Sequence, residues 1–191
     1  PEAAGKAFVL ESTGGASFEK IYLNAPSSGL VINFGSGADT LTVDVAGAFA
    51  AALTVDGGTG SDSVIFASSL DLGARDATIH AESIALHGGA TLTADGVVFD
   101  ATASTVATAP ITDTASFSYT QNETALVTID GTISAGSIAI EAKAQNYATL
   151  TGADLSDLKT LAIGATNSAQ VIVGAAAVID GTSVSLKATT D

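Results

Sequence analysis

Apolar and polar residues alternate along most of this chain in short runs, which is the pattern of half-buried β-strands. Examples are LVINF at 30–34, TLTVDV at 40–45, SIAIEA at 137–142 and SVSLKA at 183–188. Gly, Ser, Asn or Asp bounds these runs, and such residues favour turns. The 3.6-residue spacing of an amphipathic helix is nearly missing. The pattern therefore predicts an all-β protein built from many short strands.

A step of 23 residues relates two glycine-rich turns in the first third of the chain. Residues 33–43 read NFGSGADTLTV and residues 56–66 read DGGTGSDSVIF. The step carries three residues of the first turn onto the second: Gly35 onto Gly58, Gly37 onto Gly60 and Asp39 onto Asp62. Alternating apolar residues follow each aspartate, so the repeat includes a strand as well as a turn.

The same step recurs in the second half, where it aligns apolar residues in columns. One strand gives the columns Ala115, Ile138, Leu161 and Val184; Phe117, Ile140, Ile163 and Leu186; and Tyr119, Ala142, Ala165 and Ala188. A second strand gives Ala125, Ala148 and Val171, beside Val127, Leu150 and Val173. We expect Ile140, Ile163 and Leu186 to be buried and stacked on successive coils.

A fixed period of this length with several short strands per period is typical of a solenoid. We therefore expect a right-handed parallel β-helix with about 23 residues per coil. Residues one period apart would stack at the strand spacing of about 4.8 Å. Inward alanines suit a narrow coil interior. Residues 1–191 would form a single β-solenoid segment, which begins at Pro1 without Met and which we expect to be a processed piece of a longer array.

The phase of the repeat slips once, between about residues 70 and 105, where apolar pairs follow one another at closer intervals. We expect this segment to keep coiling with tighter corners. Residues 101–114 predict a hinge or a bulged corner, because Pro110 cannot donate a ladder hydrogen bond. The alternative for this stretch is a boundary between two subdomains.

The paired turns resemble the nonapeptide of RTX proteins, GGxGxD followed by an apolar residue. The full match is Gly57, Gly58, Gly60, Asp62 and Val64, and the other turn matches with Phe34 in place of the first glycine. The resemblance covers residues 30–66 and implies bound calcium, although the 23-residue period departs from the nine-residue repeats of that family. The rest of the chain resembles the Ala-, Gly- and Thr-rich β-helical repeats of large secreted bacterial surface proteins and adhesins.

The chemistry of the turns also points to Ca²⁺, which prefers six to eight oxygen ligands from carboxylates and carbonyls. Glycines let a turn direct carbonyls at one point, and stacking would bring two aspartates together that repel unless a cation separates them. The predicted calcium-binding residues are Gly35, Gly37, Asp39, Gly58, Gly60 and Asp62. The alternative is that both aspartates are solvent-facing turn residues. A second pair one period apart, Asp157 and Asp180, could share another cation but lacks the flanking glycines.

Charge and composition restrict the partners. The chain has 20 acidic and 6 basic residues and a formal net charge of −14, so nucleic acid and anionic membrane surfaces are excluded as expected partners. Its hydrophobic fraction of 47% is too high for a disordered acidic tail. Cysteine is absent, so no disulfide can form, and no apolar run approaches a membrane span. We expect no membrane insertion and a location outside the cell or on a bacterial cell surface.

These patterns favour a non-catalytic structural or adhesive module over two other classes. An enzyme acting on polysaccharides would need acids clustered with Arg or Lys, whereas a 23-residue coil would set Glu141 and Lys187 two coils apart. A carbohydrate- or surface-binding β-helix is the nearer alternative, with cell-surface glycans or neighbouring repeats of the same chain as partners. His80 and His87 lie near Glu82, but zinc needs more converging ligands.

Overall fold

The computed structural model describes residues 8–10, 21–23, 26–44, 47–48, 50–111, 116–152 and 160–191. All regular structure in these residues is β-strand. The strands of the first half are β1 (Phe8–Leu10), β2 (Ile21–Leu23), β3 (Gly29–Asn33), β4 (Ser36–Gly37), β5 (Thr40–Val43), β6 (Gly47–Ala48), β7 (Ala52–Asp56), β8 (Thr59–Gly60), β9 (Ser63–Phe66), β10 (Leu70–Asp71), β11 (Ala77–His80) and β12 (Ser83–Leu86). Five longer strands follow: β13 (Thr91–Ile111), β14 (Ser116–Ile129), β15 (Thr132–Gly152), β16 (Thr160–Val173) and β17 (Val178–Thr190).

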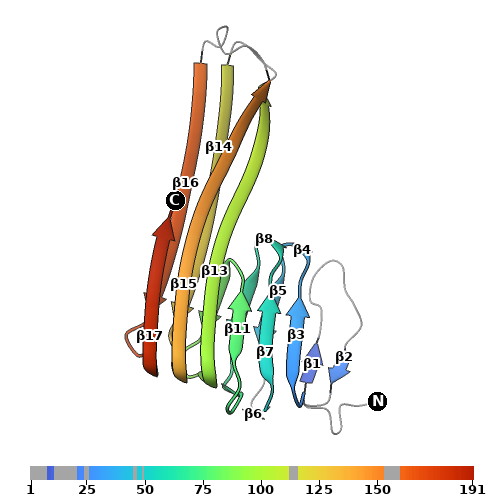
Figure 1. The fold of residues 1–191 in the computed structure, drawn as a ribbon, viewed down its shortest axis with the longest axis vertical. Coiled ribbons are helices and arrows are strands. Elements are labelled where there is room, and N and C mark those ends of the chain that lie inside the picture. The colour runs from blue at the N-terminus through green and yellow to red at the C-terminus, as the bar shows by residue number, and fades with distance from the viewer. Residues whose placement is uncertain are drawn as a thin grey trace.

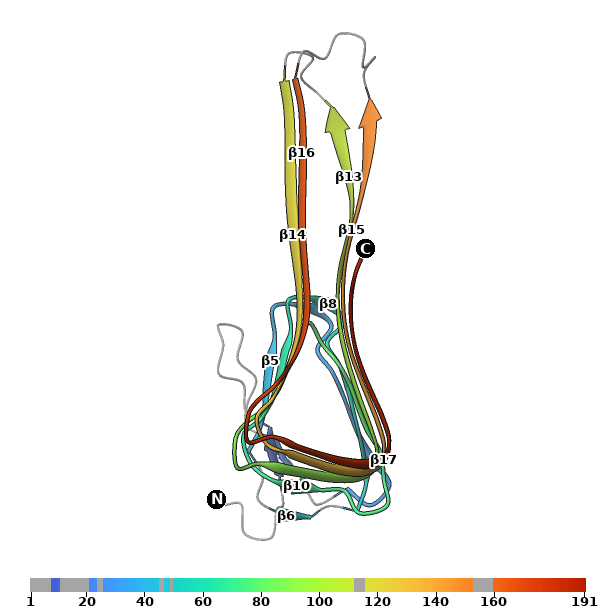
Figure 2. The ribbon, with the colours of Figure 1, turned by 90° about the vertical axis from the view of Figure 1, so that its left-hand side faces the viewer.

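Two parallel sheets form the walls of the molecule. One has the strand order β17-β15-β13-β11-β7-β3 and the other the order β16-β14-β12-β9-β5. Strands β6 and β10 pair with each other, and β10 pairs with the first residues of β13, so that they add a third face. Figure 1 shows the strands stacked in sequence order, and Figure 2 shows the chain passing around a triangular outline. The expected all-β class with parallel sheets is confirmed, and the arrangement is compatible with the expected β-helix.

The number of residues between paired strands changes along the chain. It is the expected 23 for β3 with β7, β4 with β8 and β5 with β9, as when Leu30 pairs with Leu53. It is 20 or 24 for the pairs that β11 makes with its two neighbours and for β9 with β12. The step of 20, which joins β11 to β13 and β9 to β12, fits the tighter corners expected between residues 70 and 105. For the long strands it rises to between 41 and 46, as when Ile138 pairs with Val184.

The expected stacking of Ile140, Ile163 and Leu186 is therefore wrong. Ile140 pairs with Leu186 across β15 and β17, but Ile163 lies in β16 of the opposite sheet, where it pairs with Tyr119. The physical reason is that two 23-residue steps make one passage around the molecule in this half. Residues 23 apart consequently alternate between the two sheets, and only every second member of a column shares a ladder.

The hinge or corner expected at 101–114 is not seen where the structure describes this range. Residues 101–111 form the outer part of β13, and Pro110 pairs in register with Thr151 of β15. Residues 112–114 lie outside the described residues. Proline fits here because β13 has a partner on only one side at this height, so that its missing N–H breaks no second ladder.

The interior is apolar and narrows toward one end. Rows of inward side chains run from strand to strand, and one of them comprises Ile32, Val55, Ile79, Phe99, Ile140 and Leu186. The wide part holds large side chains, with the rings of Phe66 and Phe99 stacked at 5.7 Å. Higher up, the two sheets approach each other around buried alanines: Ala101, Ala103, Ala125, Ala142 and Ala144. The inward alanines expected from the sequence thus fill the narrow part, where larger side chains have no room.

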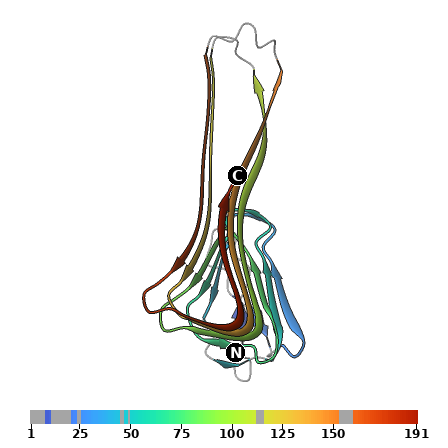
Figure 3. The same ribbon diagram turned by 60° about the vertical axis from the view of Figure 1, so that its left-hand side comes forward.

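Beyond the short strands, the four longest strands continue as an arm. We define the arm as residues 102–111, 116–124, 143–152 and 160–168, and the rest of the described stack from residue 26 as the base. Figure 2 and Figure 3 show the arm as two ribbons, β13 with β15 and β14 with β16, that face each other. The arm is thus an extension of the same two parallel sheets without the third face.

Candidate functional site

The repeated glycine turns lie one above the other at the corner where the base meets the arm. Strands β4 and β8 pair there, so that Gly37 lies beside Gly60, and the Thr59 N–H donates to the Gly35 carbonyl at 2.9 Å. Gly58 and Gly60 have φ values of 85° and 143°, which L side chains rarely adopt. A Cβ on Gly60 would lie 1.5 Å from the Gly37 carbonyl oxygen. The glycines are therefore required for close approach of the two backbones.

Three acids form a ladder directly after these turns. The Asp39 N–H donates to Asp62 Oδ1 at 2.8 Å, and the Asp62 N–H donates to Glu82 Oε2 at 2.7 Å. Each acid precedes a strand of the same sheet, namely β5, β9 or β12. The carboxylates of Asp62 and Glu82 therefore each satisfy the backbone N–H of the acid one passage earlier in the chain, just before its strand begins.

Asp62 is the most unusual member of this acid ladder. The residue is 1% exposed, and its Oδ2 is buried without a hydrogen-bond partner. That oxygen lies over Gly57, where an added Cβ would come within 2.9 Å of it. Asp39 is half-buried one passage away. An orphaned buried carboxylate oxygen is costly unless it gains a proton, a cation or a water molecule.

Burial shifts the acidity of two members of the acid ladder. Burial raises the pKa of the Asp62 carboxyl, the Asp39 N–H bond opposes that rise, and the negative charge of Asp39 adds to it. Burial also raises the pKa of Glu82; the bond from the Asp62 N–H lowers it, and the charges of Asp62 and Glu123 raise it. The site thus favours either protonation or a compensating positive charge.

The structure brings the six predicted calcium-binding residues together at one corner. The glycines stack, and the two aspartates lie in adjacent passages joined by the hydrogen bond from the Asp39 N–H to the Asp62 carboxylate. The interpretation of both aspartates as solvent-facing is wrong for Asp62, which points inward with Val64. Among the residues that the structure describes, no three His, Asp or Glu side chains converge as a metal-binding group. A cation here would therefore need carbonyl oxygens or water in addition to carboxylates.

Glu82 is the member of the acid ladder that the sequence reasoning did not assign. Its local sequence, ESIAL at 82–86, matches DSVIF at 62–66 in having an acid, a serine and then alternating apolar residues. The match is offset by 20 rather than 23 residues, which equals the register of β9 with β12. Aligning by motif instead of by a fixed period would have found it.

The other candidate residues from the sequence do not join the acid ladder. Asp157 lies outside the described residues, and Asp180 is exposed in β17. His80 Nδ1 lies 3.3 Å from Asp100 Oδ2. The expectation that Glu141 and Lys187 lie two coils apart is wrong, because they are cross-strand neighbours whose Oε1 and Nζ are 2.8 Å apart. The 46-residue step of the long strands brings them together.

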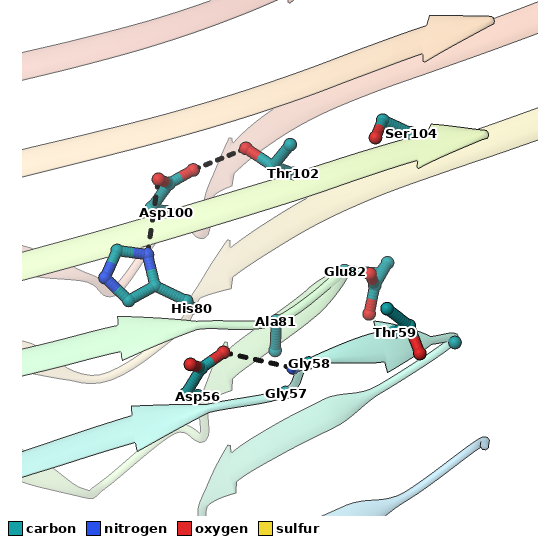
Figure 4. A pocket seen from close by; sticks show the side chains of 11 residues that line it. Asp56, Gly57, Gly58, Thr59, His80, Ala81, Glu82, Asp100, Thr102 and Ser104 are labelled. Carbon is teal, nitrogen blue, oxygen red and sulfur yellow. Dashed lines mark hydrogen bonds and ion pairs between the residues drawn. The ribbon is translucent and has the colours of Figure 1, made fainter. Parts of the chain in front are cut away.

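A pocket opens on the outer surface beside the glycine turns, at the foot of the arm (Figure 4). It has a volume of about 280 Å³ and combines carboxylates, hydroxyls and one imidazole. Thr102 Oγ1 donates to Asp100 Oδ1 at 2.6 Å, and the Gly58 N–H donates to Asp56 Oδ1 at 3.1 Å. The lining residues with side-chain polar groups are Asp56, Thr59, His80, Glu82, Asp100, Thr102 and Ser104.

Comparison with protein-family models, with curated proteins and with solved structures finds no match to this chain. Across the residues that the structure describes, no helix has the length and apolar character needed to cross a membrane.

Proposed function

We propose that this chain is a segment of a right-handed parallel β-helix that serves as a non-catalytic structural or adhesive module of an extracellular or cell-surface bacterial protein. Calcium bound at the stacked Gly–Asp turns would stiffen it. Calcium sites of extracellular modules bind in the range of about 10⁻⁴–10⁻³ M, which matches calcium outside cells. An RTX-like or adhesin-like role would follow from such a site.

The β-helix part of the proposal is supported by the way the chain advances. Every pairing within the two main sheets is parallel, and each strand pairs with strands one passage before and after it. In Figure 2, β13 rises on one side and β14 descends on the other while later strands lie nearer the viewer. That sense of advance corresponds to a right-handed coil. The passages contain 20 to 24 residues in the first half and 41 to 46 in the second.

The observation that carries the calcium proposal is the orphaned Oδ2 of Asp62. A buried carboxylate with one unpartnered oxygen, beside a second carboxylate in a chain of net charge −14, favours a bound cation. Asp62 Oδ2 and the Asp39 carboxylate would supply the charged ligands. Carbonyls of the stacked turns and water would complete the oxygen shell that Ca²⁺ prefers.

Calcium titration of the unfolding free energy tests this site. A ligand that binds only the folded state stabilises it by about 2.7 kcal/mol at a hundredfold excess over Kd. We expect calcium to stabilise the native chain and to increase amide protection first in residues 30–66. Asp62→Asn should abolish both effects, because it removes the charge and one oxygen ligand.

Asp180→Asn is the matched control, since Asp180 is exposed on β17 at the far end of the stack. It should leave the calcium response unchanged. Equal protection of residues 56–66 with calcium and with EDTA, together with no heat of binding by calorimetry, would refute the calcium site. The orphaned oxygen would then be explained by protonation.

Carbohydrate binding is a second candidate, favoured by the pocket at the foot of the arm. Its hydroxyls can donate to and accept from sugar hydroxyls, and its carboxylates can accept from them. The cell-surface glycans expected from the sequence would be the ligands. Calorimetry with neutral and amino sugars, using Asp100→Asn and the remote Asp95→Asn as a pair, tests this. Binding without release of reducing ends would separate it from a polysaccharide-degrading enzyme.

A further inference from the structure

The arm leaves a long strand edge free on the side of the earlier strands. Strand β13 pairs with β11 through residues 97–100, whereas its pairing with β15 continues to Ile111. Beyond Asp100, β13 therefore has no neighbour on that side among the strands that the structure describes. In Figure 1, β13 rises past β11, β7 and β3 with no strand on the side away from β15. This edge lies inside the stack, because β11 ends at His80 and the chain turns away into β12.

The hydrogen bonds identify which residues of β13 face the free edge. The Ala81 N–H donates to the Asp100 carbonyl at 3.2 Å, so Asp100 directs its backbone groups toward β11. In a regular strand, residues two apart direct their backbone groups to the same side. Thr102, Ser104 and Val106 therefore present their N–H and C=O groups along the free edge.

The lower part of this edge lacks the features that usually prevent pairing. Charged side chains, prolines and bulges protect most natural edge strands. Residues 101–109 contain no charged side chain and no proline. Pro110 is the first protective residue, because it lies in the same phase as Val106 and has no N–H to donate. The edge before Pro110 can therefore add a further strand, which is the geometry of peptide recognition by β-augmentation.

The acidic pocket at the foot of the arm lies at the beginning of this edge. Figure 4 shows Asp100, Thr102 and Ser104 along β13, with Asp56 and Glu82 on earlier passages of the chain. The lining has three carboxylates, one imidazole and no Lys or Arg. Each carboxylate is oriented by a hydrogen bond to one of its oxygens, from a backbone N–H or, for Asp100, from a threonine hydroxyl. The pocket therefore favours a positively charged group.

This charge determines the direction of an added strand. A strand parallel to β13 would have its amino end at the pocket, whereas an antiparallel strand would bring its carboxyl end there. Carboxylates attract an ammonium group and repel another carboxylate. Ala81 already occupies the edge position at Asp100, so the added strand has to begin in the pocket rather than continue past it.

We propose that the free edge of β13 binds an extended peptide segment of another protein, parallel to β13, with the free amino terminus of that segment in the acidic pocket. Main-chain hydrogen bonds to Thr102, Ser104 and Val106 supply affinity, and capture of the ammonium group fixes the direction. The net charge of −14 disfavours acidic side chains in the segment. This surface is separate from the calcium site. It also differs from a sugar site, which would use the pocket and leave the edge beyond it unpaired.

Calorimetric titration of the full chain with a synthetic peptide tests the role of the amino terminus. The probe has about six alternating threonine and valine residues, the usual length of a strand, and an amidated carboxyl end. We expect the peptide to bind, and acetylation of its amino terminus should weaken binding about tenfold or more, because a charge-assisted hydrogen bond is lost. Asp100→Asn should weaken it to a similar extent. Asp95→Asn, at an exposed acid outside the pocket, should leave it unchanged.

A proline substitution tests the role of the strand edge. Val106→Pro removes one N–H from the free edge and leaves the ladder with β15 intact, as Pro110 does, so peptide binding should weaken about tenfold. Asn122→Pro is the matched control on β14. The Leu126 N–H donates to the Glu82 carbonyl at 2.8 Å, so Asn122 has the corresponding phase on the free edge of the other ribbon. Asn122→Pro should leave binding unchanged, and sugar binding should respond to neither variant.

Amide exchange of the native chain gives a measurement that does not depend on any variant. Bound peptide should slow exchange at Thr102, Ser104 and Val106. Unchanged exchange at these residues, no binding of the peptide with a free amino terminus, or equal binding of the acetylated peptide would overturn the proposal. Equal weakening by Val106→Pro and Asn122→Pro, with both variants folded by circular dichroism, would overturn the assignment to β13.

Discussion

The base and the arm are made of the same strands but are held together differently. In the base, three faces enclose large apolar side chains such as Phe66, Phe99 and Leu92, all fully buried. At the foot of the arm, two ribbons face each other around the buried Ala103 and Ala144, and the next contacts described between the ribbons are polar. Thr105 Oγ1 donates to Glu123 Oε1, and Asn146 Nδ2 donates to Asn167 Oδ1 at 2.5 Å.

The two regions should contribute unequally to the stability of the molecule. Burial of a large apolar side chain contributes about 1.5–3 kcal/mol, whereas a typical hydrogen bond contributes about 0.5–1.5 kcal/mol net. The base should therefore supply most of the free energy of unfolding. The arm should depend on the base for its anchoring, through the shared strands β13, β14, β15 and β16.

Removing one aromatic ring from the base and one from the arm should give the largest difference in the free energy of unfolding. Phe99→Ala deletes a fully buried ring that stacks on Phe66, and it should lower the free energy of unfolding by about 3–5 kcal/mol. Tyr147→Ala removes a 51% exposed ring from the arm and should cost less than about 1 kcal/mol. Urea unfolding followed by circular dichroism measures both. Equal costs would contradict the division between base and arm.

The glycine turns at the boundary give the next largest effect. Gly58→Ala puts a Cβ 2.2 Å from the Gly35 carbonyl oxygen in a backbone with φ of 85°, and it should cost about 2–4 kcal/mol. Gly35→Ala is its matched control, because Gly35 has φ of 97° but nothing within 4 Å of an added Cβ. That variant should cost about 1–2 kcal/mol. The difference between the two costs measures how much the close stacking of the turns restricts residue 58. Thermal unfolding measures both costs, and equal costs would contradict the stacking.

The sequence predicted the pairing of residues in the base more successfully than the pairing in the long strands. The stacked turns were predicted because Gly35, Gly58, Asp39 and Asp62 repeat with a step that equals one whole passage of the chain. In the second half the same step equals half a passage. Nothing in the residues themselves says whether the chain turns back after one strand or extends into an arm. The pairing of Ile140 with Leu186, and of Glu141 with Lys187, could therefore be found only from the register.

The candidate site was predicted in its position but not in its orientation. The spacing placed Asp39 and Asp62 in adjacent passages, yet alternation along β9 puts Asp62 on the same side as Val64, inside the molecule. Burial, the orphaned oxygen and the contribution of Glu82 depend on where the turn ends and the strand begins. Shifting the start of the strand by one residue would turn Asp62 to the outer side. The turn sequence alone does not define where the strand starts.

The buried alanines at the foot of the arm predict a smaller loss of stability, caused by overpacking rather than by a cavity. Ala144→Leu inserts a larger side chain where the two ribbons converge, and overpacking should cost about 1–3 kcal/mol. Ala139→Leu on the exposed face of the same strand should change stability by less than about 0.5 kcal/mol. Hydrogen exchange should show faster opening of the arm in the first variant only. If both variants are neutral, the ribbons can separate freely and the narrow part is not a packed core.

The smallest expected effect is the pH dependence of the acid ladder in EDTA. The pKa of Asp62 is raised by burial above its ordinary value of 3.8, although the Asp39 N–H bond opposes the rise. Below that value Asp62 is protonated in both states, and its contribution to stability is fully present. As the pH rises through the folded pKa, the buried Asp62 carboxyl must ionise beside Asp39 and Glu82, so the free energy of unfolding decreases. Glu123 acts on the same group of charges, because its charge raises the pKa of Glu82. Asp62→Asn should flatten the pH profile from just below pH 4 upward, whereas Asp56→Asn, at an exposed turn acid, should leave it unchanged. Parallel profiles for the native chain and Asp62→Asn would show that the ionised Asp62 carboxylate is solvated in the folded state.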